Sequence, residues 1–210
     1  MNWKQITVGP LQENTYVLWN NQNEAIVFDP GSEGKRLVQE IQSLHVQPLA
    51  ILLTHAHFDH IGAVDDVRDA FRIPVYIHEQ EQDWLTDAAK NGSAHFPLGT
   101  ITARPAEHII NHEGTLTIGS FSFDMFETPG HSPGSISYYL PSAHVVFSGD
   151  ALFQGSIGRT DLPGGDYEQL MDSIHKKLLT LPEETNVAPG HGPETTIAAE
   201  MASNPFLSGF

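Results

Sequence analysis

The residues with the clearest chemical meaning are four potential metal ligands that fall within six positions: His55, His57, Asp59 and His60. They follow an apolar run at 49–53, which predicts a buried strand, and they precede a stretch with helical spacing. The ligands therefore lie on a turn at the carboxyl end of a strand, where open α/β sheets place their ligand sites. Because three imidazoles and a carboxylate suit neither an apolar core nor a solvated turn, we predict that they hold one or two divalent ions.

Three later sites share one design, in which an apolar strand ends, a glycine turns the backbone, and a single potential ligand follows. The ligands after the predicted strands at 121–126, 145–147 and 187–188 are His131, Asp150 and His191. Taken singly each is weak, because a Gly-Asp after a strand is more often a turn and a lone histidine is more often a surface or core residue. Together with the first cluster they make a set of seven that could converge on one edge of the predicted sheets.

Seven ligands are too many for one tetrahedral ion and suit two ions bridged by a carboxylate and a water. Two neighbouring dications lower the pKa of a shared water to roughly 7, so hydroxide is available at neutral pH. Such a site could hydrolyse esters, thioesters, amides or phosphodiesters without a serine or cysteine nucleophile. Imidazole and carboxylate ligands without thiolate favour zinc, with iron and manganese as alternatives.

Bulk properties narrow the class of protein. The chain has 210 residues, 40% of them hydrophobic, and it contains no cysteine, which excludes disulfides and thiolate metal sites. Its formal charge of -16 argues against binding a nucleic-acid backbone. No apolar run has transmembrane length and the start lacks the apolar segment of a signal peptide, so we expect a cytoplasmic protein that binds no membrane.

The chain reads as alternating strands and helices with no interdomain linker, so we predict one domain over residues 1–210, with sheets in the middle and helices outside. Strands are predicted at 3–8, 15–19, 25–28, 49–53, 75–77, 115–118, 121–126, 136–140, 144–147 and 187–188. Helices are predicted at 35–44, 61–71, 79–89, 167–179 and 195–201, and a long surface loop at 91–105.

The motif Thr54-His-Ala-His-Phe-Asp-His60 with the three later ligands resembles the metallo-β-lactamase superfamily, and within it the glyoxalase II-like hydrolases of the hydroxyacylglutathione hydrolase type. The resemblance covers nearly the whole chain, from 8–10 to 190–192. It implies an α+β fold, a four-layer αββα sandwich with metals at one edge of the two sheets. It also implies a small acyl-thiol substrate such as S-lactoylglutathione, attacked by a metal-bridging hydroxide.

The family pattern also implies a role for each ligand. His55, His57 and His131 would hold the first metal, and Asp59, His60 and His191 the second, with Asp150 as the bridge. Asp59 is also a candidate proton acceptor.

Asp29 matches a position outside the ligand set that orients a ligand, although a plain Asp-Pro-Gly turn is an equal interpretation. Arg159 falls where glyoxalase II enzymes have a basic residue that contacts the glutathione carboxylate, although it could instead serve a structural ion pair.

The sequence departs from glyoxalase II in ways that concern the thiol. Those enzymes carry a C-terminal helical segment that helps to bind glutathione, whereas this chain ends about twenty residues after His191, so we expect that segment to be absent. The aromatic residues expected after the last histidine and after the basic position are replaced by Gly192-Pro193 and by Thr160-Asp161. The thiol carrier can therefore differ from glutathione.

The stretch from Gly158 to Asp161 also resembles the loop of persulfide dioxygenases, superfamily members that use a single iron held by two histidines and an aspartate. A persulfide dioxygenase is therefore the leading alternative. Lactonases and β-lactamases of the superfamily fit the residues after Asp150 less well, and a metal-binding module without catalysis is disfavoured by the complete ligand set.

Overall fold

A computed structural model describes residues 1–97 and 99–207 of the chain. These residues form two compact units. Unit 1 comprises Met1–Asn111 with Ile118–Ser120, and unit 2 comprises His112–Thr117 with the chain from Phe121 onward. Each unit contains its own six-stranded sheet, apart from the last residue of β7. The prediction of a single domain stays a prediction.

The sheet of unit 1 has the strand order β1-β2-β3-β4-β5-β6, so its sequence order is also its spatial order. The first three strands are antiparallel, and β3, β4, β5 and β6 are parallel to one another. The strand bounds are Asn2–Val8, Glu13–Trp19, Glu24–Phe28, Gln47–Leu52, Val75–His78 and His108–Ile110. The parallel half therefore brings the carboxyl ends of β3 and β4 to one edge, with Phe28 opposite Leu52.

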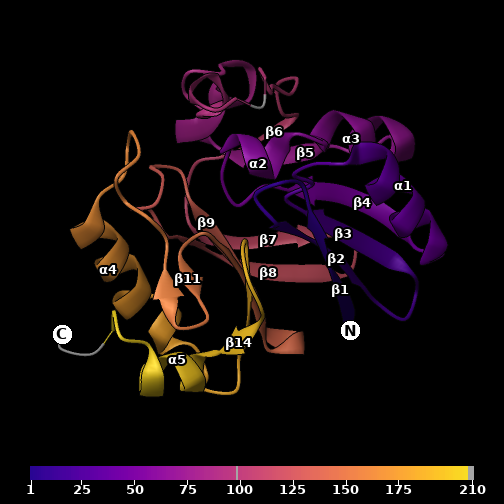
Figure 1. The fold of residues 1–210 in the computed structure, drawn as a ribbon. Coiled ribbons are helices and arrows are strands. Elements are labelled where there is room, and N and C mark those ends of the chain that lie inside the picture. Colours follow the sequence, from indigo (N-terminus) through magenta and orange to yellow (C-terminus); the bar gives the residue numbers. More distant parts are fainter. Residues whose placement is uncertain (98, 208–210) are drawn as a thin grey trace. The chain divides into compact units, whose positions relative to one another are not determined.

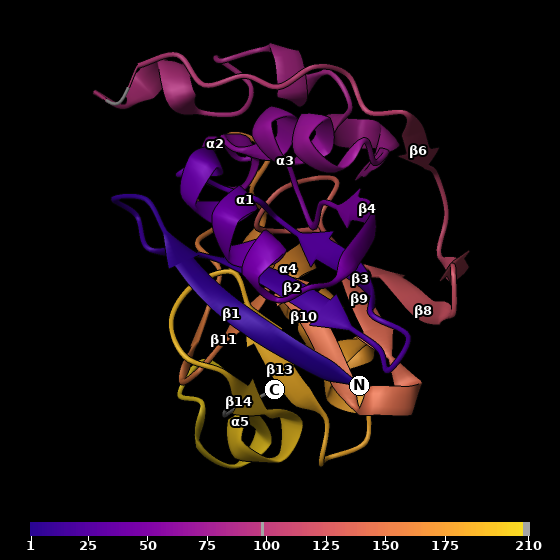
Figure 2. The ribbon, with the colours of Figure 1, turned by 90° about the vertical axis from the view of Figure 1, so that its right-hand side faces the viewer.

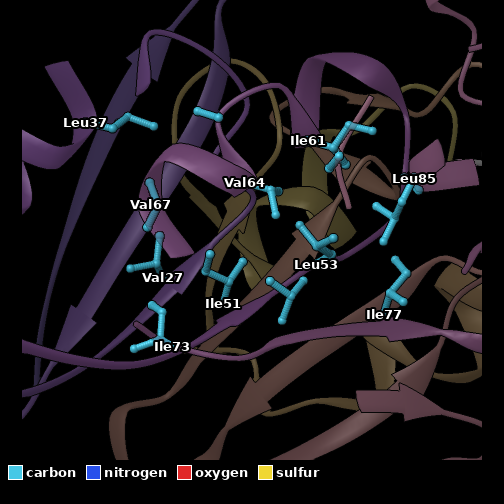
Figure 3. Close-up of a cluster of buried hydrophobic side chains, with 14 of the residues drawn as sticks. Val27, Leu37, Ile51, Leu53, Ile61, Val64, Val67, Ile73, Ile77 and Leu85 are labelled. Carbon is cyan, nitrogen blue, oxygen red and sulfur yellow. The ribbon is translucent and has the colours of Figure 1, made fainter. Parts of the chain in front are cut away.

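Two amphipathic helices cover this sheet, α1 at Gly34–Ser43 and α3 at Val64–Phe71 (Figures 1 and 2). Their apolar residues recur at helical spacing, and Leu37, Ile41, Val64 and Val67 are buried. These side chains pack with strand residues such as Ile51 in one cluster (Figure 3). Residues near the ends of β3 and β4 are thus packed in this core.

The sheet of unit 2 has the order β14-β13-β10-β9-β8-β7. β10 pairs with β13 in parallel and with β9 antiparallel, and β8 is antiparallel to β9. Consequently β8, β10 and β13 all run in the same direction and end at the same edge. The bounds of β7 to β10 and of β13 and β14 are Gly114–Ile118, Phe121–Glu127, Ile136–Leu140, Val145–Gly149, Asn186–Pro189 and Thr195–Thr196.

Unit 2 also contains a small hairpin of β11 (Leu152–Phe153) and β12 (Ser156–Ile157), together with α4 (Tyr167–Lys176) and α5 (Ile197–Ser203). Leu170 and Ile174 of α4 are fully buried and pack in one cluster with strand residues such as Val146 and Val187. In the described part of the chain no helix is long and apolar enough to cross a bilayer.

Most predicted elements are confirmed within a few residues, but the helix predicted at 79–89 is wrong. Only two short 3₁₀ turns form there, Glu79–Glu81 and Trp84–Thr86. The side chain of Asp87 accepts hydrogen bonds from the backbone N–H groups of Ala89 and Lys90, which offers the backbone an alternative to helical bonds.

Two other predicted helices are shorter than expected. The helix predicted at 61–71 is divided into α2 (Phe58–Ile61) and α3, and the one predicted at 167–179 ends at Lys176 before a 3₁₀ turn. The strands β6, β11, β12 and β14 are additional to the prediction, because two or three residues are too few to show an alternating pattern.

Candidate metal centre

The ligand turn of unit 1, residues 54–60, leaves the end of β4 and continues directly into α2. His55 and His60 are completely buried and His57 is nearly so, whereas the carboxylate of Asp59 is 16% exposed. The Oδ2 atom of Asp59 lies 4.0 Å from Nε2 of His60. The four residues that the sequence singled out therefore lie together, with three buried imidazoles and one partly exposed carboxylate.

Asp29 directly follows the neighbouring strand β3, and its carboxylate accepts several hydrogen bonds from the ligand turn. Thr54 donates to it twice, from its backbone N–H to Oδ1 (2.7 Å) and from its hydroxyl to Oδ2 (2.5 Å). The same Oδ2 lies 3.0 Å from Nδ1 of His60, and Oγ1 of Thr54 lies 3.1 Å from Nδ1 of His55. One carboxylate thus orients His60 directly and His55 through a hydroxyl.

These bonds decide which nitrogen of each ring faces a cation. A carboxylate only accepts, and the Thr54 hydroxyl already donates to Asp29, so the Nδ1 atoms of His55 and His60 carry the protons. Nε2 is then the basic nitrogen in both rings, as required of a ligand. Asp29 could also be taken for a ligand, because an oxygen of its carboxylate lies within 4.8 Å of ligand atoms of both histidines. Its bonds to the protonated nitrogens assign it the orienting role.

Glu13 is a second buried carboxylate in this region, and sequence reasoning missed it. Only 1% of the residue is exposed, and Oε1 lies 3.8 Å from Nδ1 of His60. Burial raises the pKa of the Glu13 carboxyl well above its usual value, although His60 acts in the opposite direction. Glu13 opens strand β2, and no spacing in the sequence relates it to the ligand turn.

In unit 2 the three predicted ligands follow β8, β10 and β13, which end at the same edge of the sheet. Oδ2 of Asp150 lies 3.5 Å from Nε2 of His131 and 3.6 Å from Nε2 of His191. Two imidazole nitrogens thus converge on one carboxylate oxygen, an arrangement suited to cations held between them. The ring of Phe153 contacts His191 edge-on at 6.2 Å between centroids.

His131 is oriented by the main chain. Its Nδ1 lies 2.8 Å from the backbone carbonyl oxygen of Arg159, so Nδ1 donates and Nε2 again is the basic nitrogen. The approach of these segments requires glycine at Gly130 and Gly158. A Cβ at Gly130 would lie 2.3 Å from the backbone nitrogen of Leu170, and one at Gly158 would lie 1.8 Å from the carbonyl oxygen of Asp150.

The side chain of Arg159 binds Asp161 rather than any other described residue. Its Nε and Nη2 donate to the two carboxylate oxygens of Asp161, both at 2.7 Å. This hydrogen bond to the guanidinium lowers the pKa of Asp161 to about 2. Both side chains are exposed, at 56% and 68%. Arg159 therefore carries a carboxylate-binding fork that already holds a carboxylate of the same chain.

All nine residues predicted for the site lie in one of these two groups. The seven candidate ligands among them offer imidazole nitrogens and carboxylate oxygens, and in His55, His60 and His131 the proton lies on Nδ1. This donor chemistry fits divalent transition metals. The assignment of these residues as ligands stays a prediction. Sequence reasoning assigned no role to Thr54, and it overlooked Glu13 and a third buried carboxyl side chain, Glu81.

The chain belongs to the metallo-β-lactamase superfamily, whose sequence profile matches residues 8–191. It is 55% identical over 210 residues to the probable metallo-hydrolase YqgX of Bacillus subtilis, covering 100% of this chain and 99% of that one. It is 39% identical over 209 residues to the hydroxyacylglutathione hydrolase GloC of Haemophilus influenzae, with 99% of each covered. The family resemblance read from the ligand motifs is confirmed, and the chain is a metallo-hydrolase of this superfamily.

Two solved structures support the fold. The crystal structure of the B3 metallo-β-lactamase BLEG-1 matches this chain with a TM-score of 0.97 at 58% identity. The match covers 99% of this chain and 100% of the BLEG-1 chain. TTHA1623 in a di-iron-bound form has a TM-score of 0.83 at 43% identity, covering 97% and 100%. The predicted fold class, the α+β metallo-β-lactamase fold, is therefore confirmed.

Proposed function

We propose that this protein is a dinuclear metal hydrolase that cleaves acyl thioesters, with S-hydroxyacyl thiols as the substrate class. The observation that carries the proposal is the orientation of the histidines. In three of them Nδ1 is held by an oxygen acceptor of the chain, which leaves Nε2 as the ligand atom. The similarity to GloC, a hydroxyacylglutathione hydrolase, supports the choice of a thioester over other acyl groups.

The ligand turn of unit 1 and the strand-end ligands of unit 2 together would hold two ions, zinc in the first place and iron or manganese as alternatives. Following the family pattern, His55, His57 and His131 would hold one ion and Asp59, His60 and His191 the other. Asp150 would lie between the two sets of ligands, which agrees with its Oδ2 lying within 3.6 Å of two imidazole nitrogens. When bound, such ions lower the pKa of a water to roughly 7 and polarise a carbonyl oxygen.

The residues of the chain have separate tasks in this reaction. Asp29 holds the imidazoles of His55 and His60 in the ligand orientation, and the Arg159 carbonyl does the same for His131. Asp59 is the partly exposed carboxylate of the ligand turn and can accept the proton that leaves the attacking water. A thiolate is a good leaving group, so no strong general acid is required.

Recognition of the substrate is proposed to involve Arg159. A thiol with a carboxylate would have to compete with Asp161 for the guanidinium. Because exposed ion pairs contribute only about 0–1 kcal/mol, such an exchange is energetically accessible. The thiol carrier is therefore proposed to bear a carboxylate, without being restricted to glutathione.

A persulfide dioxygenase using a single iron is the second candidate. The loop from Gly158 to Asp161 supports it. The similarity to a protein crystallised in a di-iron-bound form makes iron a metal to include in the tests, although that protein holds two ions rather than one. The 58% identity to a B3 metallo-β-lactamase makes β-lactams a further substrate class to include in any test.

Elemental analysis of the purified protein, followed by assays of the zinc-, iron- and manganese-loaded forms, tests the proposal. We expect about two metal equivalents and hydrolysis of S-lactoyl thiols. The panel adds neutral acyl thioesters, a lactone, a β-lactam and a persulfide with an oxygen electrode. Inert thioesters together with oxygen uptake on the persulfide would replace the thioesterase by the dioxygenase, and turnover of the β-lactam alone would replace it by a lactamase.

A further inference from the structure

Residues 79–96, called the support segment here, lie beside α2 in unit 1 (Figures 1 and 2). The segment contains only 3₁₀ turns and loop, yet three of its residues are completely buried: Glu81, Leu85 and Asn91. Leu85 belongs to the apolar cluster with Leu53 and Ile77 (Figure 3), and its carbonyl accepts from the N–H of Ala103 at 2.7 Å. A loop anchored in this way can hold the residues that it contacts in a fixed position.

The support segment contacts three consecutive residues of the ligand turn. Oε2 of Glu81 accepts a hydrogen bond from the backbone N–H of Ala56 at 2.5 Å. The indole of Trp84 packs against the ring of His57, with 5.7 Å between centroids. The carbonyl of Asn91 accepts from the backbone N–H of Phe58 at 3.1 Å.

The hydrogen bond that Glu81 accepts lies between two of the candidate ligands. The N–H of Ala56 belongs to the peptide plane between His55 and Ala56, so fixing it restrains the backbone on both sides of that plane. His55 and His57 flank Ala56, and their rings meet at 88° with 4.8 Å between centroids.

We propose that Glu81 is a positioning residue that sets the angle between the imidazoles of His55 and His57 through the backbone of Ala56. This inference rests on the proposed metal centre. It assigns a function to a segment that does not itself supply a metal ligand. A polar side chain fully removed from water is costly unless it is hydrogen-bonded, and the bond of Glu81 falls between two ligands whose positions must be held closely.

The test compares four variants with the full-length wild type, each stripped of metal by a chelator and titrated with Zn²⁺ and Co²⁺. Glu81→Gln keeps an oxygen acceptor, Glu81→Asp keeps the charge but is shorter by one methylene, and Glu81→Ala removes both. Glu79→Gln is the matched control, because Glu79 begins the same 3₁₀ turn and is exposed.

We expect the Ala and Asp variants to bind metal about 10- to 100-fold more weakly, as for other groups that orient metal ligands. Their Co²⁺ absorption spectrum should shift, since the ligand geometry changes. The Gln variant should lose clearly less affinity than the Ala variant, and Glu79→Gln should match the wild type. Thermal unfolding of the metal-free proteins identifies any variant that fails to fold.

Wild-type affinity and an unchanged Co²⁺ spectrum in the Ala and Asp variants would overturn the inference. So would an equal loss in the Gln and Ala variants, because the amide oxygen retains the acceptor. If the Ala variant does not fold, the comparison of Asp with Gln decides in the same way. A wild type that binds no metal would instead remove the proposed function itself.

Discussion

The two groups of candidate ligands are built in opposite ways. In unit 1 the ligands lie in one turn and are oriented by buried acidic side chains. Asp29 binds His60 directly and His55 through the hydroxyl of Thr54, and Glu81 acts through the backbone of Ala56. In unit 2 each ligand follows a different strand, and His131 is oriented by a main-chain carbonyl.

The difference follows from the local backbone. The turn with ligands at positions 55, 57, 59 and 60 lies between a strand and a helix, and acidic side chains from other elements accept hydrogen bonds from its main chain. In unit 2 the strands themselves place the ligands, since β10 and β13 are paired in parallel and Gly190 donates its N–H to the carbonyl of Gly149 at 2.8 Å. Side-chain substitution should therefore disturb the support of unit 1 more readily than that of unit 2.

The largest effect should come from removing ligands of unit 2, which tests whether they belong to the same centre as the ligand turn. We expect His131→Ala and Asp150→Ala to lower the metal content below two equivalents. Turnover should fall by more than the 10- to 100-fold typical of orienting groups. Elemental analysis and thioester kinetics measure both, with His112→Ala as the control because that histidine of unit 2 is exposed. Unchanged metal content and turnover would separate the two groups.

The same contrast explains what the sequence could reveal. The ligand turn could be predicted because His55, His57, Asp59 and His60 lie within six positions after an apolar strand, a spacing typical of metal sites. His131, Asp150 and His191 were individually ambiguous, and they gained meaning from the repeated strand-glycine-ligand design and from the family resemblance.

The supporting residues could not be predicted, because their partners lie far away along the chain. Glu81 contacts Ala56 across 25 residues, and Glu13 lies beside His60 across 47. A helix was predicted at 79–89, and this wrong prediction gave no reason to expect that the side chain of Glu81 binds the ligand turn. For Asp29 the sequence predicted either a turn or an orienting role. The left-handed backbone (φ 44°) is typical of a turn, and the fold shows in addition that the carboxylate binds Thr54 and His60.

A smaller effect should separate side-chain support from main-chain support. Asp29→Asn keeps the left-handed turn, because Asn tolerates positive φ, but it removes the charge beneath His60. We expect Zn²⁺ affinity to fall about 10- to 100-fold. Arg159→Ala is the counterpart in unit 2: the carbonyl that orients His131 remains, so metal affinity should stay as in the wild type. Competition titrations with a chromophoric chelator measure both, and equal losses in the two variants would contradict the contrast.

The smallest effect concerns the exposed pair of Arg159 and Asp161 and bears on substrate choice. Arg159→Ala should raise KM for carboxylate-bearing thioesters by up to about fivefold, which corresponds to the upper value for an exposed ion pair, and should leave neutral thioesters unaffected. Asp161→Asn should lower KM for the same anionic substrates, because it removes the competing carboxylate. An equal change on neutral thioesters would count against carboxylate binding by Arg159.

The titration of Asp161 provides a readout of the pair that does not depend on any substrate. The pKa of this carboxyl is about 2 in the folded chain, below its ordinary value of about 4, so the pair stabilises the fold above pH 4 and loses that contribution as the pH falls towards 2. In Arg159→Ala the pKa should return towards the ordinary value, as measured by carbon-detected NMR of the side-chain carboxyl. A pKa that stays near 2 without the guanidinium would show that another group holds Asp161, and Arg159 would then be available to the substrate without competition.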